Sequence, residues 1–392
     1  MISTGDGNVK GPTDVRPSVL VVTMGTDYVA PARMPRELSR AGFAVTLIAP
    51  KGALATHTGF VDKVGYFPEN PTVYEWMQVL AGAMRRIDPL LVLPGDDVTL
   101  RMLMWLVLDP PEQLRTELLA ELTDLVVRSL GDPAHYAASV DKAALVRRAA
   151  AAGVPVPPGD AVDDERAAVD LAESLGYPVI VRPTVGTASS GVMRCKDAAG
   201  VRQAMRELPQ TVGWIPPGAK RALVQRMLNG RHANHPAVAW QGRELAGFTR
   251  VAVRQFPEGG PSSVARYAPN PAIAAANARL IGALGLTGFA STEYLIDADT
   301  GVAHLIEINR RMTPATHTGP RAGVDLASAL AAACASREWD GPTDAPDGTD
   351  LTLALFPQEW LRDHASPFLT TCPNDAPWDD PALLRAMLNL GG

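Results

Sequence analysis

The sequence lacks the features of a disulfide-stabilised, membrane-spanning or nucleic-acid-binding protein. Its 392 residues contain three cysteines, an odd and widely spaced set that argues against a disulfide framework or a zinc site: Cys195, Cys334 and Cys372. The formal net charge is −6, so no basic excess indicates nucleic acid or an acidic membrane as a partner. No apolar run approaches the roughly 18 residues of a membrane-spanning helix. We therefore expect a cytoplasmic protein without nucleic-acid or membrane partners, with a homodimer as the default assembly.

The first third of the chain is predicted to be a flexible tail followed by an α/β domain. Residues 1–17 have no apolar core of the kind found in a signal peptide. Residues 18–130 alternate strand-like and helix-like patterns, which favours a parallel sheet wrapped by helices. The expected elements are strands at 18–24, 43–50 and 90–94 and a helix at 31–42. Ligands bind beyond the carboxyl ends of parallel strands, so residues 25–27 and 95–97 are expected near a crevice. Simple turn glycines explain Gly25 and Gly95 equally well, because no GxGxxG fingerprint follows the first strand.

A second region begins after a helix that is ended by Gly153 and a proline-rich link, which suggests a domain boundary near residues 131–158. The elements expected beyond it are strands at 177–183, 221–227, 236–240 and 245–253, helices at 197–207, at 270–288 and from about 323, and a β-hairpin around DADTG (297–301). Residues 340–392 are rich in Pro, Asp and Trp. We expect them to form a C-terminal extension with at most two short ordered pieces.

The hairpin carries the strongest chemical pattern. Side chains alternate faces along a strand, so Glu307 and Asn309 share one face and Ile306 and Ile308 share the other. A loop at 297–301 places Glu293 on the Glu307 face, whereas a register slip of one residue places it on the opposite face. Two carboxylates and a carboxamide are hard oxygen ligands suited to Mg²⁺ or Mn²⁺. The alternative is an amphipathic surface hairpin with a solvated polar face.

Basic and small residues elsewhere suggest anion binding. Arg310 and Arg311 follow the hairpin directly, and a guanidinium group matches phosphate or carboxylate geometry. In TVGTASSGV (184–192), Gly and Ser would allow backbone N–H groups to approach phosphate oxygens, although a flexible turn explains this loop equally well. A lone lysine at a helix start, such as Lys142, is usually a solvated surface residue.

Taken in order, four segments resemble the ATP-grasp superfamily. They are VDKAALVRRAAAAGVPVP, YPVIVRPTVGTASSGV, ALVQRMLNG, and the hairpin from FASTEYLI to VAHLIEINRRM. The resemblance covers about residues 135–335 and has a general likeness to carbamoyl-phosphate synthetase and carboxylate–amine ligases. It implies an α/β and α+β chain with an ATP-grasp fold at 131–339, including a small lobe at about 155–230. The α/β domain at 18–130 would be the parallel-sheet domain that precedes the grasp.

The resemblance also implies residue roles. Lys142 and Arg182 would hold ATP phosphates, and Arg311 would stabilise the phosphoryl group during transfer. The other implied positions are the phosphate-covering loop (186–191, with Gly186, Ser189, Ser190 and Gly191), the adenine linker (Gln225, Met227 and Leu228), the ribose position (His232) and the metal ligands (Glu293, Glu307 and Asn309). The chain departs from the family at Arg182, where lysine is commoner, at Gln225, where an acidic residue is frequent, and at His232, where a glutamate often stands.

Substrate groups are harder to assign. Arg250, Arg254 and Arg266 lie on or near strands expected to face the cleft, and one of them could neutralise an acyl phosphate or bind a substrate carboxylate. We take Arg266 as a catalytic candidate and Arg254 as a substrate candidate, although surface arginines explain each equally well. Residues 312–323 form a candidate substrate loop that contains His317 and Arg321. A histidine in such a place is more often structural than catalytic.

The resemblance implies a reaction in which ATP, with Mg²⁺ or Mn²⁺, phosphorylates a small carboxylate to an acyl phosphate. An amine then displaces the phosphate to form an amide or peptide bond. Two alternatives remain at this point. The first is an ATP-grasp enzyme with another acceptor, for example one that activates bicarbonate or transfers a phosphoryl group. The second is a catalytically degenerate nucleotide-binding protein, which the departures at Gln225 and His232 motivate.

Overall fold

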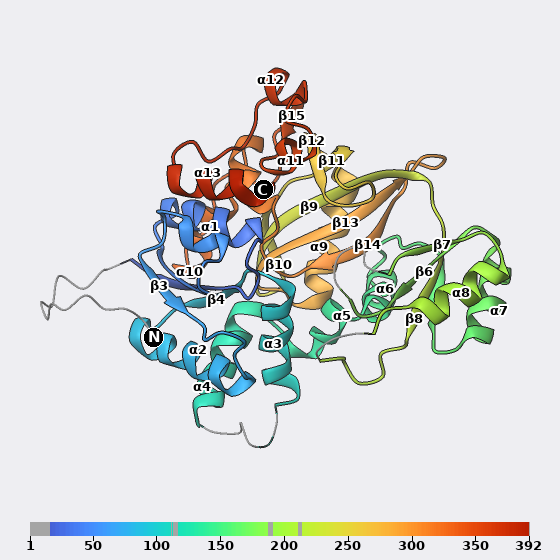
Figure 1. Cartoon of the computed structure of the whole chain (residues 1–392), viewed down its shortest axis with the longest axis horizontal. Helices are drawn as coiled ribbons and strands as arrows, with labels where there is room; N and C mark the ends of the chain where they lie inside the picture. Colours follow the sequence, from blue (N-terminus) through green and yellow to red (C-terminus); the bar gives the residue numbers. More distant parts are fainter. Residues whose placement is uncertain (1–15, 111, 113–116, 187–190, 211–213, 392) are drawn as a thin grey trace, which may run out of the picture.

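The computed structural model describes residues 16–110, 112, 117–186, 191–210 and 214–391, which form three sheets (Figure 1). The first is parallel, in the order β3-β2-β1-β4, as predicted for the N-terminal region. Its strands are β1 (Ser18–Val22), β2 (Ala44–Ala49), β3 (Lys63–Tyr66) and β4 (Leu91–Pro94). The helices around it are α1 (Val29–Arg40), α2 (Val73–Ile87), α3 (Asp97–Leu108) and α4 (Glu117–Leu130). In the described residues, no helix has the length and apolarity needed to cross a lipid bilayer.

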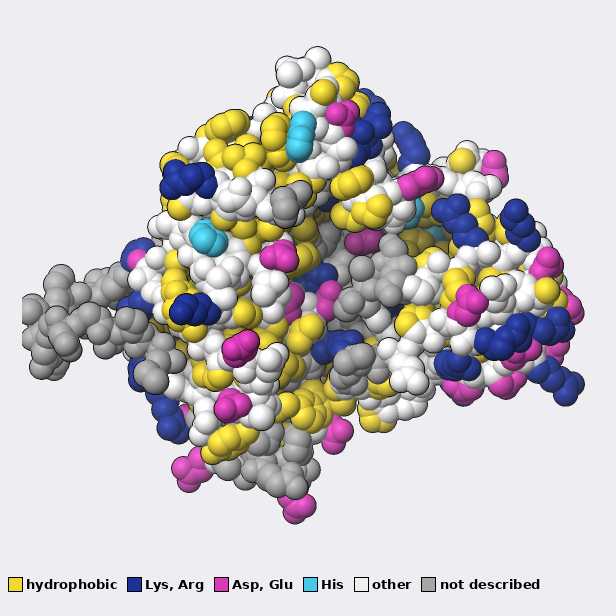
Figure 2. Space-filling model, viewed as in Figure 1, with side chains coloured by type: hydrophobic (Ala, Val, Ile, Leu, Met, Phe, Trp, Pro, Cys, Tyr) yellow, Lys and Arg dark blue, Asp and Glu magenta, His cyan; other side chains and the backbone are white. Residues whose placement is uncertain are grey.

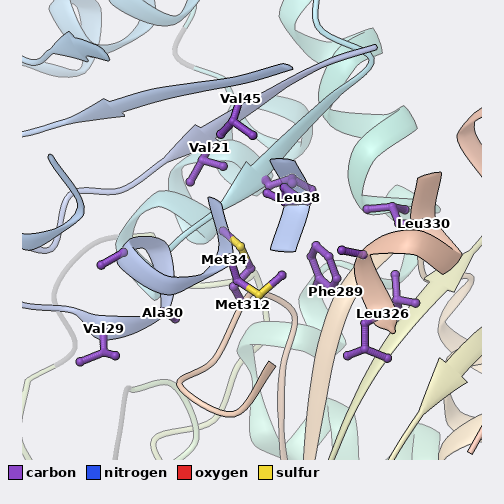
Figure 3. Packing of buried hydrophobic residues seen from close by; sticks show 14 of the residues in the cluster. Val21, Val29, Ala30, Met34, Leu38, Val45, Phe289, Met312, Leu326 and Leu330 are labelled. Atoms are coloured by element: carbon purple, nitrogen blue, oxygen red, sulfur yellow. The ribbon is translucent and has the colours of Figure 1, made fainter. Parts of the chain in front are cut away.

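Both faces of this parallel sheet are buried, which explains why its strands are apolar throughout. Val19 and Val21 pack in one core with α1, and Leu20 and Val22 pack in another with α2, α3 and α4. Figure 3 shows Met34 and Leu38 of α1 close to Phe289 and to Leu330 of α10 (Leu326–Cys334). The first core therefore continues from the N-terminal sheet into the large sheet, and it fixes the two sheets against each other.

The second sheet is antiparallel, in the order β5-β8-β6-β7, and forms a small lobe at the right of Figure 1. One face packs against two helices. The other face presents Ile180, Arg182 and Gln225 to a cleft. The elements are β5 (Gly159–Val162), α7 (Glu165–Leu175), β6 (Val179–Pro183), β7 (Met193–Cys195), α8 (Ala198–Glu207) and β8 (Ala222–Arg226).

The third and largest sheet is antiparallel, in the order β14-β13-β9-β11-β12-β15, with β10 paired to β9. Helices α6 (Lys142–Ala151) and α9 (Pro271–Leu284) pack on one face of it. The segment predicted as one strand at 245–253 forms parts of two strands. β10 pairs with the end of β9, and β11 then pairs with an earlier part of β9. The strands are β9 (Gly230–Trp240), β10 (Arg243–Gly247), β11 (Arg250–Gln255), β12 (Ser262–Tyr267), β13 (Gly288–Asp297), β14 (Ala303–Asn309) and β15 (Leu351–Ala354).

The C-terminal extension is more ordered than the sequence suggests, so the expectation of at most two short ordered pieces was wrong. Its strand β15 pairs with β12, and the helices α11 (Gln358–Arg362), α12 (Phe368–Thr371) and α13 (Pro381–Leu388) follow. Asp380 accepts a hydrogen bond of 2.6 Å from Thr58, and Leu383 and Met387 are buried in the core that contains α1. The order comes from partners more than 80 residues away, which local composition does not reveal.

Candidate active site

A cleft of about 1030 Å³ lies where the small lobe, the large sheet and the N-terminal region meet. Figure 2 shows this face of the molecule hollowed between the N-terminal part and the small lobe, with acidic and basic side chains gathered there. The cleft is lined from the small lobe by Arg182 and Gln225, from the large sheet by Glu293 and Glu307, and from the N-terminal region by Asp97. The predicted crevice beyond the parallel strands therefore opens into this cleft.

The floor of the cleft holds the predicted carboxylate pair. Glu293 lies directly opposite Glu307 in the β13–β14 ladder, and Asn309 Nδ2 donates to Glu293 Oε1 over 3.1 Å. Burial raises the pKa of Glu293, although Arg311 and Arg250 oppose the shift. Burial also raises the pKa of Glu307, and the negative charge of Glu293 adds to that shift. Two neighbouring carboxylates repel each other when both are ionised. A cation bound between them would stabilise the doubly ionised pair.

A β-bulge sets this arrangement. Glu293 pairs with Glu307 but Tyr294 pairs with Leu305, so Ile306 is an extra residue on β14. Ile306 lines the cleft, whereas Ile308 is buried in the core beside α9. The expectation that Ile306 and Ile308 share a face was therefore wrong, because simple alternation fails at a bulge. The bulge also leaves the Ile306 carbonyl free to accept a hydrogen bond of 3.0 Å from Arg182.

Arg311 is held by a residue from the N-terminal region. Its Nε and Nη2 donate to the two carboxylate oxygens of Asp97 over 2.6 and 2.7 Å, and Nη2 also donates to Asn309 Oδ1 over 3.1 Å. The Tyr28 hydroxyl accepts a further hydrogen bond from Arg311. Burial by itself lowers the pKa of Arg311, but Tyr28 and Asp97 outweigh burial and raise it. The neighbouring Asp96 caps the start of α3, and its carboxylate also accepts a hydrogen bond from the backbone N–H of Gly25.

The two predicted phosphate-binding cations lie beside the carboxylate pair, Arg182 on β6 of the small lobe and Lys142 at the start of α6. Lys142 is buried and donates to the Gly186 carbonyl over 2.8 Å, so the usual solvated role of such a lysine does not apply. Burial lowers the pKa of Lys142, and the charge of Glu307 opposes this. Arg182 is also buried, and its Nη2 donates to Gln225 Oε1 over 3.0 Å. In the described part of the chain neither cation forms a close ion pair with a carboxylate, although the charge of Glu307 acts on the pKa of both.

The remaining predicted nucleotide-binding residues belong to the adenine and ribose positions and to the phosphate-covering loop. Gln225, Met227, Leu228 and His232 line the cleft at the end of β8 and the start of β9. Gly186 lines a smaller pocket that adjoins Lys142 and Glu307. Gly191 begins the return of the loop toward β7, whereas Ser189 and Ser190 lie outside the described residues.

Three of the predicted substrate or catalytic residues do not line the cleft. Arg266 is exposed and pairs with both carboxylate oxygens of Asp350, at 2.6 and 2.8 Å. Arg266 lies opposite Val251 in the β11–β12 ladder, whereas Arg250 lies opposite Tyr267. The side chains of Arg266 and Arg250 therefore point to opposite faces of the sheet. Arg254 stacks on the Phe368 ring at 5.4 Å, and Arg321 is exposed. None of the three therefore lines the cleft, because face and register decide what each side chain reaches.

His317 also lies away from the cleft lining, in a buried pair with the C-terminal extension. Its Nε2 is 2.8 Å from Asp375 Oδ2, and Arg33 of α1 donates to the Asp375 carbonyl. Burial lowers the pKa of His317 to about 4, the Arg33 and Arg250 charges add to this, and Asp375 opposes it. His317 therefore joins the candidate substrate loop to the C-terminal extension, and Arg33 joins the extension to α1.

His317 should make the stability of the protein depend on pH. The folded pKa of about 4 lies below the ordinary value of 6.5, so the unfolded chain binds more protons between these values. The contribution is fully present above pH 6.5 and is lost as the pH falls toward 4, a difference of roughly 3 kcal/mol. We expect His317→Gln to flatten this part of the urea-unfolding profile. Exposed His57→Gln should retain it, and an unchanged slope in His317→Gln would contradict the assignment.

Part of the chain matches a known protein family. Residues 141–236 match the family described as carbamoyl-phosphate synthase L chain, ATP binding domain. The chain has an ATP-grasp fold. It is 26% identical over 172 residues to the arginine-specific carbamoyl phosphate synthase large chain of Bacillus subtilis, which is 41% of this chain but only 16% of that relative. This chain therefore matches only about a sixth of the length of that curated relative.

Solved structures support the ATP-grasp fold over most of the chain. A biotin carboxylase–βγ-ATP complex from Campylobacter jejuni matches with a TM-score of 0.63 and 15% identity, covering 83% of this chain and 72% of that one. An L-amino acid ligase from Bacillus licheniformis matches with a TM-score of 0.59 and 18% identity, covering 84% and 77%. The predicted fold class, an ATP-grasp fold preceded by a parallel sheet, is confirmed.

Sequence reasoning missed two residues of the cleft. Tyr28 contacts Arg311, and Asn234 on β9 lies opposite Glu293. Nothing in the sequence near either residue marks it. Asn234 reaches the site through strand pairing with β13, and Tyr28 reaches it from a different sheet.

Proposed function

We propose that this ATP-grasp chain is an ATP-dependent ligase that activates a small carboxylate as an acyl phosphate and joins it to an amine, releasing ADP and phosphate. The observation that carries the proposal is the Glu293–Glu307 pair, with Asn309 and Arg311 beside it on the floor of the cleft. Arg182 borders the same pair from the small lobe, and Lys142 borders it from the start of α6. This combination is suited to holding a divalent cation on a nucleotide and stabilising a phosphoryl group in transfer.

The nucleotide would lie between the small lobe and the large sheet. The cleft-lining backbone and apolar side chains at Met227 and Leu228 would hold the base, and Lys142 and Arg182 would hold the phosphates. Gln225 departs from the family pattern in a way that fits this role. Its neutral amide oxygen accepts a hydrogen bond from Arg182, whereas a carboxylate there would partly neutralise the guanidinium. Arg182 therefore keeps its full charge for a phosphate.

The residues also fit a magnesium ion. Two facing carboxyls with raised pKa values and a nearby carboxamide are a hard oxygen set, and a divalent cation would relieve their mutual repulsion. When bound, the metal would withdraw charge from the transferring phosphate. Arg311 would add a fixed positive charge on the same side, because Asp97 and Tyr28 hold its guanidinium in one orientation.

The test is Mg²⁺-dependent release of ADP and phosphate from ATP across pooled small carboxylic acids and amines. ADP release that requires one acid, with an amide product in the presence of one amine, would support the proposal. ADP release with bicarbonate and no amine would indicate the alternative acceptor class. ATP binding without turnover under any condition would contradict a ligase and favour a nucleotide-binding role. Arg254→Gln, outside the cleft, serves as the matched surface control.

A further inference from the structure

The hydrogen-bond donors of Arg311 are all used by neighbouring protein groups. Its Nε and one N–H of Nη2 donate to the carboxylate of Asp97, and the second N–H of Nη2 donates to Asn309. Its Nη1 donates to the Met312 carbonyl over 3.2 Å and to the Tyr28 hydroxyl. Each N–H of the guanidinium group therefore has an acceptor. In this arrangement, a ligand in the cleft meets the charge of Arg311 through one of these partners.

Tyr28 is the partner that can pass this charge on to a ligand. It directly precedes α1, lines the cleft, and packs its ring against the Arg311 guanidinium at 5.1 Å. A phenol hydroxyl donates one proton in addition to accepting through its lone pairs. Because the Tyr28 oxygen accepts from Arg311, its own proton points away from the guanidinium, and none of the described residues accepts it. The carboxylate of Asp97 and the carbonyl of Met312, in contrast, only accept.

The electrostatic surroundings of Tyr28 suit a hydrogen-bond donor. A hydroxyl that accepts from a charged group is polarised and becomes a stronger donor itself. Burial raises the pKa of Tyr28 to about 12, Arg311 opposes the rise, and the charge of Asp97 adds to it. The hydroxyl therefore keeps its proton near neutral pH. The charge of Glu293 also acts on this pKa, so the hydroxyl lies close to the carboxylate pair.

The direction from which Tyr28 reaches the carboxylate pair decides what it can touch. It comes from the loop between β1 and α1, which Asp96 fixes by accepting hydrogen bonds from Thr23 over 2.6 Å and from the Gly25 backbone over 2.9 Å. The proposed nucleotide site lies toward the small lobe instead. In a phosphoryl transfer the attacking and leaving oxygens are in line. The acid that receives the phosphoryl group would therefore lie on the Tyr28 side of it.

We propose that Tyr28 is a catalytic residue whose hydroxyl donates a hydrogen bond to the acyl oxygen of the acyl phosphate and stabilises the oxyanion formed when the amine attacks. This proposal rests on the proposed ligase function. The nitrogen lone pair forms the C–N bond while the C=O π electrons move to the acyl oxygen. They return as the C–O bond to phosphate breaks, and phosphate leaves with that bonding pair and takes up the proton that the nitrogen loses. Tyr28 keeps its own proton throughout.

Single-turnover kinetics of the full-length protein separate the two halves of the reaction. ATP, the acid and the amine found by the ADP-release screen are mixed rapidly with excess enzyme, and ADP and amide are quantified after quenching. Tyr28→Phe keeps the ring beside Arg311 and removes only the hydroxyl. We expect ADP formation to stay within about threefold of the parent and the rate constant of amide formation to fall about 100-fold, the typical cost of losing one oxyanion donor. Amide should therefore lag behind ADP in the variant.

A second tyrosine supplies the matched control. Tyr136 also has an arginine, Arg310, against its ring, but its hydroxyl donates to the Gly131 carbonyl over 3.1 Å and it lies outside the cleft lining. Tyr136→Phe should leave the ratio of the two rates unchanged.

Each other outcome rejects a definite claim. If Tyr28→Phe slows ADP and amide formation by the same factor, Tyr28 only orients Arg311 and the proposal is overturned. Amide formation that keeps the parent rate also overturns it, and in both cases the parent's amide product leaves the ligase proposal standing. A parent that forms no amide with any acid and amine overturns both.

Discussion

Replacing Glu307 with glutamine is expected to reduce Mg²⁺-dependent ADP release by at least about 1000-fold. Glutamine keeps the shape of the side chain but removes one of the two charges that face each other across β13 and β14. Glu293 and Asn309 would then remain as a carboxylate and a carboxamide, a weak set for a hard divalent cation. The measurement is ADP release at increasing Mg²⁺, together with Mn²⁺ binding followed by electron paramagnetic resonance.

The hairpin supplies its own control for this prediction. Asp299 lies in the exposed turn between the same two strands, and Asp299→Asn removes a charge of the same sign without touching the cleft. It should retain ADP release and Mn²⁺ binding. If Glu307→Gln keeps turnover within about tenfold of the parent and an unchanged Mg²⁺ dependence, Glu307 is not a metal ligand and the proposed site is wrong.

The sequence predicted the parts of the molecule that depend on local pattern. Sequence patterns identified the parallel sheet and the β13–β14 hairpin, because continuous apolar runs and alternating faces are visible in a short window. The chemistry of Glu293, Glu307 and Asn309 followed from the same hairpin, and of the two registers considered, the structure has the one that places Glu293 on the Glu307 face. Lys142 and Arg182 came from the family resemblance, and the structure places both in the cleft.

The parts that failed depend on pairings between distant segments. Arg250, Arg254 and Arg266 are equivalent in sequence, and only the bulged pairing of β11 with β12 turns one into the cleft and two away from it. His317 is indistinguishable from a catalytic histidine until Asp375, 58 residues later, packs against it. The expected position of Asp97 near a crevice is confirmed, whereas its partner Arg311, 214 residues away, was not predicted. Such contacts depend on how the three sheets pack together, and a short stretch of sequence does not reveal that packing.

The second large effect is expected at the Asp97–Arg311 pair. Arg311→Lys should lower kcat about 100-fold or more with KM for MgATP within about threefold, because lysine keeps the charge but cannot form the bidentate contact that orients it. Asp97→Asn should lower kcat by a smaller factor, about tenfold, since Arg311 stays charged but is held less firmly. Both effects fall on kcat, as expected for a group that acts on the transferring phosphoryl and for its positioning residue. The measurement is steady-state ADP release with ATP varied at saturating acid.

A second bidentate pair in the chain separates this role from folding. Arg266 holds both oxygens of Asp350 with nearly the same distances, but on the surface and outside the cleft. Arg266→Lys should leave kcat unchanged and alter the free energy of unfolding by less than about 1 kcal/mol. Removing the Asp97 charge beside buried Arg311 should cost more, about 2 kcal/mol, because it leaves a guanidinium poorly paired. If Asp97→Asn lowers stability but leaves kcat unaltered, the pair only fastens the N-terminal region to the large sheet, and Arg311 needs no help from Asp97 in the reaction.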